Sequence, residues 1–441
     1  MGKRYASELS RLSQTYAWAL DEPIETLSAA LSAAASLPLI AVGSGGSLSA
    51  AHLACSLHQR HTGMLSRPLT PLELISSPIL LRSASVLIIS AGGSNRDILS
   101  AFENAVAREP RRCMVLCFRK ESRLARLAQS YRFVDLIDLK PPSIGDGFLA
   151  TNSLLAFFAL LVRGYEDAFS LSKRLPRKLE EILSSSQYIE AVRASCAPLW
   201  GRDTLVVLYG PSVSSAAVDL ESKFSEAALG NVQLADFRNF AHGRHHWLAK
   251  RGPQTGVLAI FSNDEQDLAD KTLRLIPSSI PVARICISRD SRTASVAALA
   301  VVLHIVGAAG DHCGIDPGRP GVPVFGRRIY GLRALRTLRD QSPSPETLAI
   351  DTPFELPTRD SIRTVILTLA ADGLHPREIA ERLNQLGLKS LQGKPLSAKT
   401  VAKRITEDER RCARKVNRAA SLRRLRRAET EVEPATSSLG R

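Results

Sequence analysis

The stretch AVGSGGSLSAAHLA, residues 41–54, joins a strand-like pattern to a helix-like one. Five small residues follow the apolar run Leu39–Val42, namely Gly43, Ser44, Gly45, Gly46 and Ser47. A turn that leaves a parallel strand and enters a helix presents free N–H groups at the positive end of the helix dipole. The glycines let the backbone approach a ligand, and the serines offer hydroxyl donors. This composition favours a bound phosphate or carboxylate, although a tight turn without a ligand has the same pattern.

The turn does not match the two common nucleotide motifs. The third glycine of the dinucleotide fingerprint would fall on Leu48, and no Gly-Lys-Ser/Thr follows as in a P-loop. The sequence therefore favours a smaller anionic ligand at this turn.

Apolar runs alternate with helical patterns from Leu39 to about Ile305. The runs include LPLIAV, SVLIIS, CMVLCF, TLVVLYG, GVLAIFS and VARICIS. Continuous apolar strands separated by helices are typical of parallel sheets covered on both faces. The sequence therefore predicts an α/β fold.

An internal repeat divides this region in two. LIAVGSGGSLSAA is echoed by VVLYGPSVSSAAV 167 positions later, and SVLIISAGGSNRDIL is echoed by GVLAIFSNDEQDL. We expect α/β domains at 22–180 and 181–330. A proline-containing linker at 331–358 follows, then a small helical domain at 359–411 and a basic tail at 412–441.

A second polar turn follows the strand-like run SVLIIS. Its residues are Ser90, Gly92, Gly93, Ser94 and Asn95. Adjacent parallel strands would bring both turns to the carboxyl edge of one sheet, where such folds bind ligands. Two polar turns at that edge make a small anionic ligand more plausible than a plain turn.

GSGGS and SAGGSNRDIL together resemble the two phosphate loops of the sugar isomerase (SIS) domain. The doubled arrangement over 22–330 resembles the tandem SIS region of glucosamine-6-phosphate synthase and related deaminase/isomerases. This resemblance implies two flavodoxin-like SIS domains with parallel sheets and a phosphosugar ligand. The family's second loop is usually Ser-x-Ser-Gly-x-Thr. Gly92 and Asn95 replace two of its hydroxyl donors here, so the resemblance does not imply an ordinary hexose 6-phosphate.

Charged residues recur in AVDLESKFSEAALGNVQLADFRNFAHGRHH, residues 217–246. We expect a helix from Pro211 to Leu229 that ends at Gly230. Its residues Asp219, Lys223 and Glu226 are spaced i, i+4 and i+7, so they share one helix face. A generic solvated face would show the same spacing.

His242 follows Glu226 by sixteen positions. In the tandem SIS isomerases an acid–x3–Lys–x2–Glu helix is followed by a His-Gly at this interval, with Glu as the first acid where this chain has Asp219. The resemblance implies that Glu226 moves the proton between C1 and C2, that His242 opens the sugar ring, and that Lys223 supports Glu226. Carboxylate and imidazole groups suit these proton transfers. Because the histidine can come from a neighbouring subunit in these relatives, a homodimer is implied.

The positive charge is concentrated near the C-terminus. The chain carries +15 in total; residues 359–428 hold 18 Lys/Arg and 7 Asp/Glu, or +11, which leaves +4 for the remainder. Three amphipathic helices are predicted in RDSIRTVILTLAADG, HPREIAERLNQLG and LSAKTVAKRITEDERR. The region resembles the helical DNA-binding segment that follows serine-recombinase catalytic domains. That resemblance implies a recognition helix with Lys399, Thr400, Lys403 and Arg404. A protein-binding appendix with a basic surface is the alternative.

Several function classes are disfavoured. Seven cysteines, an odd number, do not indicate a disulfide framework, and we expect no metal site and no cofactor. Cys113 and Cys117 are expected to be core residues. No apolar run reaches the roughly 18 residues of a membrane span, Leu154–Val162 being the longest, and no signal peptide is expected. The sequence predicts a cytoplasmic protein.

Two functions remain open. The first is an isomerase or deaminase acting on a sugar phosphate or sugar-like nucleotide. The second is a regulator that senses a sugar phosphate without turnover and binds nucleic acid through its C-terminal helices.

Overall fold

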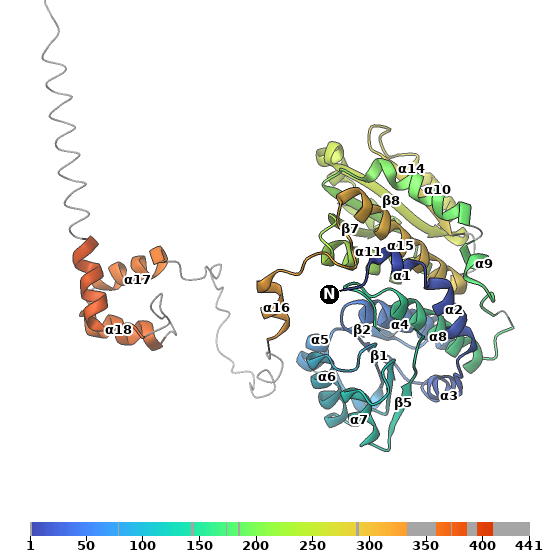
Figure 1. Ribbon diagram of the computed structural model, residues 1–441, viewed down its shortest axis with the longest axis horizontal. Coiled ribbons are helices and arrows are strands. Elements are labelled where there is room, and N and C mark those ends of the chain that lie inside the picture. The colour runs from blue at the N-terminus through green and yellow to red at the C-terminus, as the bar shows by residue number, and fades with distance from the viewer. Residues whose placement is uncertain are drawn as a thin grey trace, which may run out of the picture. The chain divides into compact units, whose positions relative to one another are not determined.

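The computed structural model describes residues 2–77, 79–142, 145–172, 174–183, 186–287, 291–332, 359–371, 373–385 and 395–408 (Figure 1). The chain divides into two compact units, residues 1–343 and 344–441. The domain boundaries expected within the first unit stay a prediction.

The first unit contains two parallel sheets. The first has the strand order β2-β1-β3-β4-β5, which is the flavodoxin-like order. Its strands are β1 (Leu39–Val42), β2 (Ser66–Leu69), β3 (Ser85–Ser90), β4 (Arg112–Cys117) and β5 (Val134–Asp138). All four strand pairings are parallel.

The second sheet repeats this order over four strands, β7-β6-β8-β9. Its strands are β6 (Thr204–Tyr209), β7 (Asn231–Asp236), β8 (Thr255–Ser262) and β9 (Val282–Ile287). Because β6 and β8 occupy the places of β1 and β3, the sheets follow the internal repeat seen in the sequence. The α/β fold with two parallel sheets is therefore confirmed.

The longer helices of the first unit cover both faces of the sheets. They are α2 (Leu12–Asp21), α3 (Glu25–Ala33), α4 (Gly46–Thr62), α6 (Arg96–Ala107), α8 (Asn152–Ala168), α10 (Ser186–Cys196), α11 (Ser214–Glu226), α14 (Gln266–Leu273) and α15 (Ser291–Cys313). Shorter helices are α1 (Tyr5–Leu9), α5 (Pro71–Ser76), α7 (Arg123–Gln129), α9 (Leu179–Leu183), α12 (Phe237–Asn239), α13 (His246–Arg251) and α16 (Val324–Tyr330).

Alternate residues of the strands enter different cores. Leu39 and Ala41 of β1 belong to a large core that also contains Val207 of β6. Their neighbours Ile40 and Val42 pack on the opposite face, in a separate core with α6. Helices α4, α8, α11 and α15 fill the space between the two sheets (Figure 1). The large core therefore joins the two halves through these central helices.

The most apolar helix is α15. The expectation that no apolar segment is long enough to span a membrane is wrong for this helix. Within the described residues, one segment, Thr293–Cys313, is long and apolar enough to cross a membrane, and 89% of its apolar window is buried inside the fold. Burial of this kind is what a central core helix shows. The cytoplasmic location stays a prediction.

The helix expected from Pro211 to Leu229 is shorter than predicted. A 3-10 turn covers Pro211–Val213, and α11 spans only Ser214–Glu226. Ala228 takes a positive φ of 54° and ends the helix, and the Leu229 amide donates to the Phe224 carbonyl at 2.9 Å. The left-handed residue is therefore Ala228 rather than Gly230.

The second unit contains α17 (Arg359–Ala371), α18 (Pro376–Gln385) and a third helix over 398–408. Ile366, Ile379, Leu383 and Val401 are among the buried residues of its separate small core. Gly373, at φ 85°, lies just after the first helix. Most of the predicted linker (333–358) and the basic tail lie outside the described residues.

Candidate functional site

The glycines of the first polar turn are required by close packing. A Cβ on Gly43 would lie 2.2 Å from the Ser47 carbonyl oxygen, and one on Gly46 would lie 2.4 Å from the Ala150 Cβ. Gly45 has φ 53° and ψ −135°, a conformation that side chains rarely allow. The glycines therefore allow a tight turn whose backbone N–H groups face outward from the sheet edge.

Hydrogen-bond donors of this turn are free to meet a ligand. Within the described part of the chain, the amides of Ser44 and Gly45 have no acceptor, and the Ser44 and Ser47 hydroxyls have no partner. Helix α4 begins here without a side-chain cap. Unfilled amides at the start of a long helix suit an anion.

In the second polar turn, more of the hydrogen-bonding groups are already paired with neighbouring residues of the chain. The Ser90 hydroxyl accepts from the Gly93 amide at 3.1 Å, and the Ser94 hydroxyl donates to the Gly92 carbonyl at 3.2 Å. The Asn95 side-chain oxygen caps α6 by accepting from two amides, at 2.9 and 3.0 Å. Fewer of its predicted donors are therefore available to a phosphate.

The two turns come from neighbouring strands. β1 pairs with β3 in parallel, with Val42 opposite Ile88. Both turns therefore leave the same carboxyl edge side by side, as expected from the sequence. This edge is the topological switch point, because β1 leads outward to β2 on one side and β3 continues the sheet on the other.

Asp219 and Lys223 form a buried ion pair rather than a solvated face. The Lys223 Nζ lies 2.8 Å from Asp219 Oδ1, and the side chains are 2% and 0% exposed. The Ser49 hydroxyl of α4 donates to the same Asp219 oxygen at 3.2 Å. Burial raises the pKa of the Asp219 carboxyl, and Lys223 and Ser49 act in the opposite direction. The pair links α11 of one half to the helix that carries the first turn.

Glu226 and His242 lie in exposed positions. The Glu226 carboxylate accepts from the Ser222 hydroxyl at 2.6 Å. His242 lies at a kink between α12 and α13, where the backbone of His242 and Gly243 is not helical. Its side chain has no hydrogen-bond partner among the described residues. Both groups are thus accessible to a molecule from solution, in contrast to Asp219 and Lys223.

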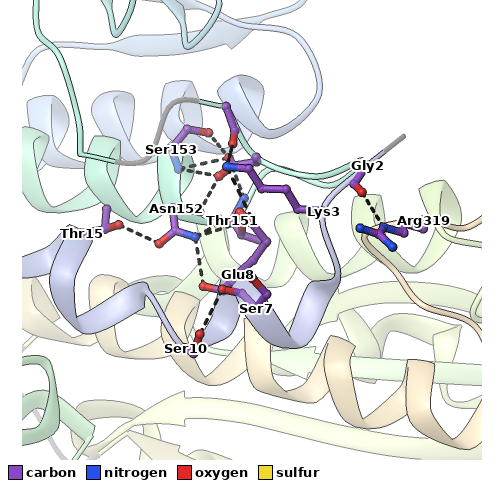
Figure 2. Close-up of polar contacts among 12 residues, drawn as sticks. Gly2, Lys3, Ser7, Glu8, Ser10, Thr15, Thr151, Asn152, Ser153 and Arg319 are labelled. Atoms are coloured by element: carbon purple, nitrogen blue, oxygen red, sulfur yellow. Dashed lines mark hydrogen bonds and ion pairs between the residues drawn. The ribbon is translucent and has the colours of Figure 1, made fainter.

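A polar cluster that the sequence did not reveal surrounds the Glu8 side chain (Figure 2). The buried Glu8 carboxylate accepts from Thr151 at 3.0 Å and from Asn152 at 3.2 Å, and Lys3 Nζ lies 3.8 Å away. Burial raises the pKa of Glu8, whereas Thr151, Asn152 and Lys3 lower it. Ala150, which packs against Gly46, is the neighbour of Thr151. An acidic residue in a short N-terminal helix carries no sequence signal of such burial.

Further contacts tie the N-terminal segment to this edge. The Tyr5 amide donates to Asp316 at 2.9 Å, and Arg319 donates to the Gly2 carbonyl (Figure 2). Burial raises the pKa of the Tyr5 hydroxyl, and the negative charge of Asp219 raises it further. The N-terminal segment is therefore held against the segment that contains Asp316 and Arg319.

The remaining predicted residues lie elsewhere. Burial raises the pKa of Cys113 to about 12 and that of Cys117 to about 11, which fits core residues. Among the described residues no cluster of His, Cys, Asp and Glu could hold a metal ion.

In the second unit, Lys399 and Lys403 are exposed, and Arg404 is half-buried. The Thr400 amide donates to the Ser397 hydroxyl at 3.2 Å, so Ser397 caps this helix and Thr400 belongs to the cap. The nucleic-acid-binding role of these residues stays a prediction.

No protein-family model and no curated protein matches this sequence. Solved structures do match. The chain is 18% identical to tagatose-6-phosphate ketose/aldose isomerase from Escherichia coli, with a TM-score of 0.56, over 73% of this chain and 96% of that one. It is 16% identical to glucosamine-6-phosphate deaminase from Thermotoga maritima, with a TM-score of 0.55, over 72% and 98%.

A third match is the C-terminal domain of glucosamine-fructose-6-phosphate aminotransferase from Francisella tularensis. The identity is 14% and the TM-score 0.55, over 70% of this chain and 96% of that one. At these identities the likeness concerns the fold. The first unit therefore shares with these structures a fold built on two flavodoxin-like parallel sheets.

Proposed function

We propose that this protein binds a sugar phosphate at the two polar turns and isomerises or deaminates it. The observation that carries the proposal is the adjacency of the turns after β1 and β3 at the switch point of a flavodoxin-like sheet. Free amides and hydroxyls of Gly43–Ser47 hold the phosphate. The turn of Ser90, Gly92, Gly93, Ser94 and Asn95 closes the pocket on its other side.

Glu226 acts as the base that moves a proton between C1 and C2 of the sugar. It is exposed at the end of α11, and only the Ser222 hydroxyl donates to it among the side chains described. A carboxylate in an accessible position can act as a general base. Asp219 and Lys223 serve as positioning residues, because their buried pair ties α11 to α4.

His242 opens the sugar ring. It is exposed and carries an imidazole, a group that commonly acts as a general acid or base. Its exposure also permits it to act on a sugar held by a second copy of the chain, which is the reason for proposing a homodimer.

The test is proton exchange in D2O, followed by NMR, with fructose 6-phosphate, tagatose 6-phosphate and glucosamine 6-phosphate as probes. Replacing Glu226 by Gln is expected to slow exchange at C1 or C2 by about 10²–10⁴-fold while leaving binding intact. Glu221→Gln is the matched control, because Glu221 accepts from Ser225 one turn away in the same manner.

The proposal is supported if the wild-type protein exchanges the proton of at least one probe, if Glu226→Gln loses this exchange and if Glu221→Gln keeps it. Exchange that is equally fast in Glu226→Gln would remove Glu226 as the base. Binding without exchange in the wild-type protein would favour the sensing function, in which the C-terminal helices bind nucleic acid through Lys399, Thr400, Lys403 and Arg404.

A further inference from the structure

A strongly basic turn packs directly against the second polar turn. It spans residues 118–123, FRKESR, and follows β4. A Cβ on Gly93 would lie only 2.2 Å from the Ser122 hydroxyl oxygen, and the Leu124 amide donates to the Gly93 carbonyl at 2.9 Å. The basic turn is therefore a wall of the proposed phosphate site.

The cations of this turn lack partners. Arg119, Lys120 and Arg123 are exposed, and none forms an ion pair with another described residue. The Ser122 hydroxyl is occupied, because it caps α7 by accepting from the Ala125 amide at 3.1 Å. The turn therefore offers a ligand three cationic side chains and a single carboxylate, that of Glu121.

Helix α16 brings more positive charge to the same place. The Asn95 side-chain nitrogen donates to the Tyr330 hydroxyl, and Arg96 donates to the Gly331 carbonyl, both at 3.3 Å. Arg327 and Arg328 on this helix are exposed. The three segments 91–97, 118–123 and 324–332 together hold six cations and two carboxylates, Asp97 and Glu121.

This charge exceeds what one phosphate requires. A phosphate monoester carries about −1.5 to −2 at neutral pH. The turn after β1 already supplies free amides and hydroxyls for such a group. Arginine and lysine side chains are the usual partners of further phosphate oxygens, and arginine binds them in a bidentate manner. The contact between Gly93 and Ser122 places the basic turn next to the second polar turn.

We propose, on the basis of the function proposed above, that the ligand carries a diphosphate rather than a single phosphate. One phosphate lies at the turns after β1 and β3, and the next is bound by Arg119, Lys120 and Arg123. Ring opening and proton transfer between C1 and C2 need a free anomeric carbon. The diphosphate is therefore esterified to the far end of the sugar, as in a nucleoside diphosphate joined to the terminal carbon of a reducing sugar.

The test compares pyrophosphate with inorganic phosphate by isothermal titration calorimetry at constant pH and ionic strength. The full chain is expected to bind pyrophosphate at least about tenfold more tightly. In the double variant Arg119→Gln/Arg123→Gln, the preference for pyrophosphate over phosphate is expected to be lost. The matched control is Arg111→Gln/Arg132→Gln, which removes two exposed arginines that precede β4 and β5, at the opposite edge of the same sheet.

Each outcome decides between the two proposals. Equal affinity of the wild-type protein for both anions overturns the diphosphate proposal and leaves the sugar-phosphate proposal standing. Loss of the pyrophosphate preference in the control variant also overturns it, because the preference would then reflect net charge alone. Binding of neither anion contradicts both proposals.

Discussion

The buried pair of Asp219 and Lys223 connects α11 to the helix of the first turn through Ser49. The helical spacing of Asp219 and Lys223 could be read from the sequence, but such spacing does not distinguish a buried helix face from a solvated one. Which charges are buried depends on the packing of α4 against α11. The same limit applies to Glu8, whose partners Thr151 and Asn152 are more than 140 positions away in the chain.

Removing one member of this pair should strongly destabilise the protein. Lys223→Met leaves the Asp219 carboxylate buried without its cation, and we expect a loss of about 3–5 kcal/mol in the free energy of unfolding. Urea unfolding followed by circular dichroism measures the change. The double variant Asp219→Asn/Lys223→Met should recover most of the loss. A single variant as stable as the wild type would contradict the buried ion pair.

His58 should make stability depend on pH. Its Nε2 lies 2.9 Å from the Leu37 carbonyl and its Nδ1 3.0 Å from the Tyr165 hydroxyl, so the neutral ring satisfies both. Burial lowers the pKa of His58 below its ordinary value of 6.5, and the Leu37 carbonyl acts in the opposite direction. The unfolded chain therefore binds more protons, and the stabilisation is complete above about pH 6.5 and lost as the pH falls through the lowered pKa.

Urea unfolding of the wild type and His58→Gln at pH 7.5 and 5.5 tests this effect. The stability advantage of the wild type should be larger at pH 7.5. An advantage of the same size at both pH values would show that His58 does not titrate in this way.

At the scale of elements, the strands with continuous apolar runs were predictable, and the edge strands were less so. β2, with the sequence SRPL, contains a proline, and β7, with the sequence NVQLAD, is largely polar. Both lie at sheet edges, where one side lacks a neighbouring strand and the apolar pattern weakens. The end of α11 was misplaced because Gly230 is the usual helix terminator, whereas Ala228 takes that conformation here.

Ala228 offers a direct test of this helix end. Its positive φ is costly for a residue with a Cβ, so Ala228→Gly should stabilise the protein by about 0.5–1 kcal/mol. Ala227→Gly is the control, because Ala227 is buried and has a negative φ, so glycine should destabilise there. Thermal and urea unfolding measure both. Destabilisation by Ala228→Gly would contradict the left-handed conformation.

At the scale of the whole chain, the positive charge is concentrated in residues 359–428, which carry +11 of the total +15. If these residues contact nucleic-acid phosphates, affinity must fall steeply with salt, because each contact releases counterions. The logarithm of affinity for duplex DNA should fall linearly with the logarithm of salt concentration. Lys399→Gln/Lys403→Gln should lower that slope by up to about 2.

Arg377→Gln is the control for this measurement, because Arg377 is exposed on α18 and paired with Glu381. It should change the slope less than the lysine variant. Fluorescence anisotropy with labelled DNA over a salt series gives the slopes. Binding that does not depend on salt would exclude phosphate contacts by this region.

Crystals soaked with glucosamine 6-phosphate test whether the turns after β1 and β3 hold the phosphate of a sugar. We expect phosphate density within hydrogen-bond distance of the Ser44 and Gly45 amides, with Glu226 of the same chain or His242 of either copy facing the sugar carbons. A phosphate bound elsewhere, or a sugar out of reach of both side chains, would contradict it.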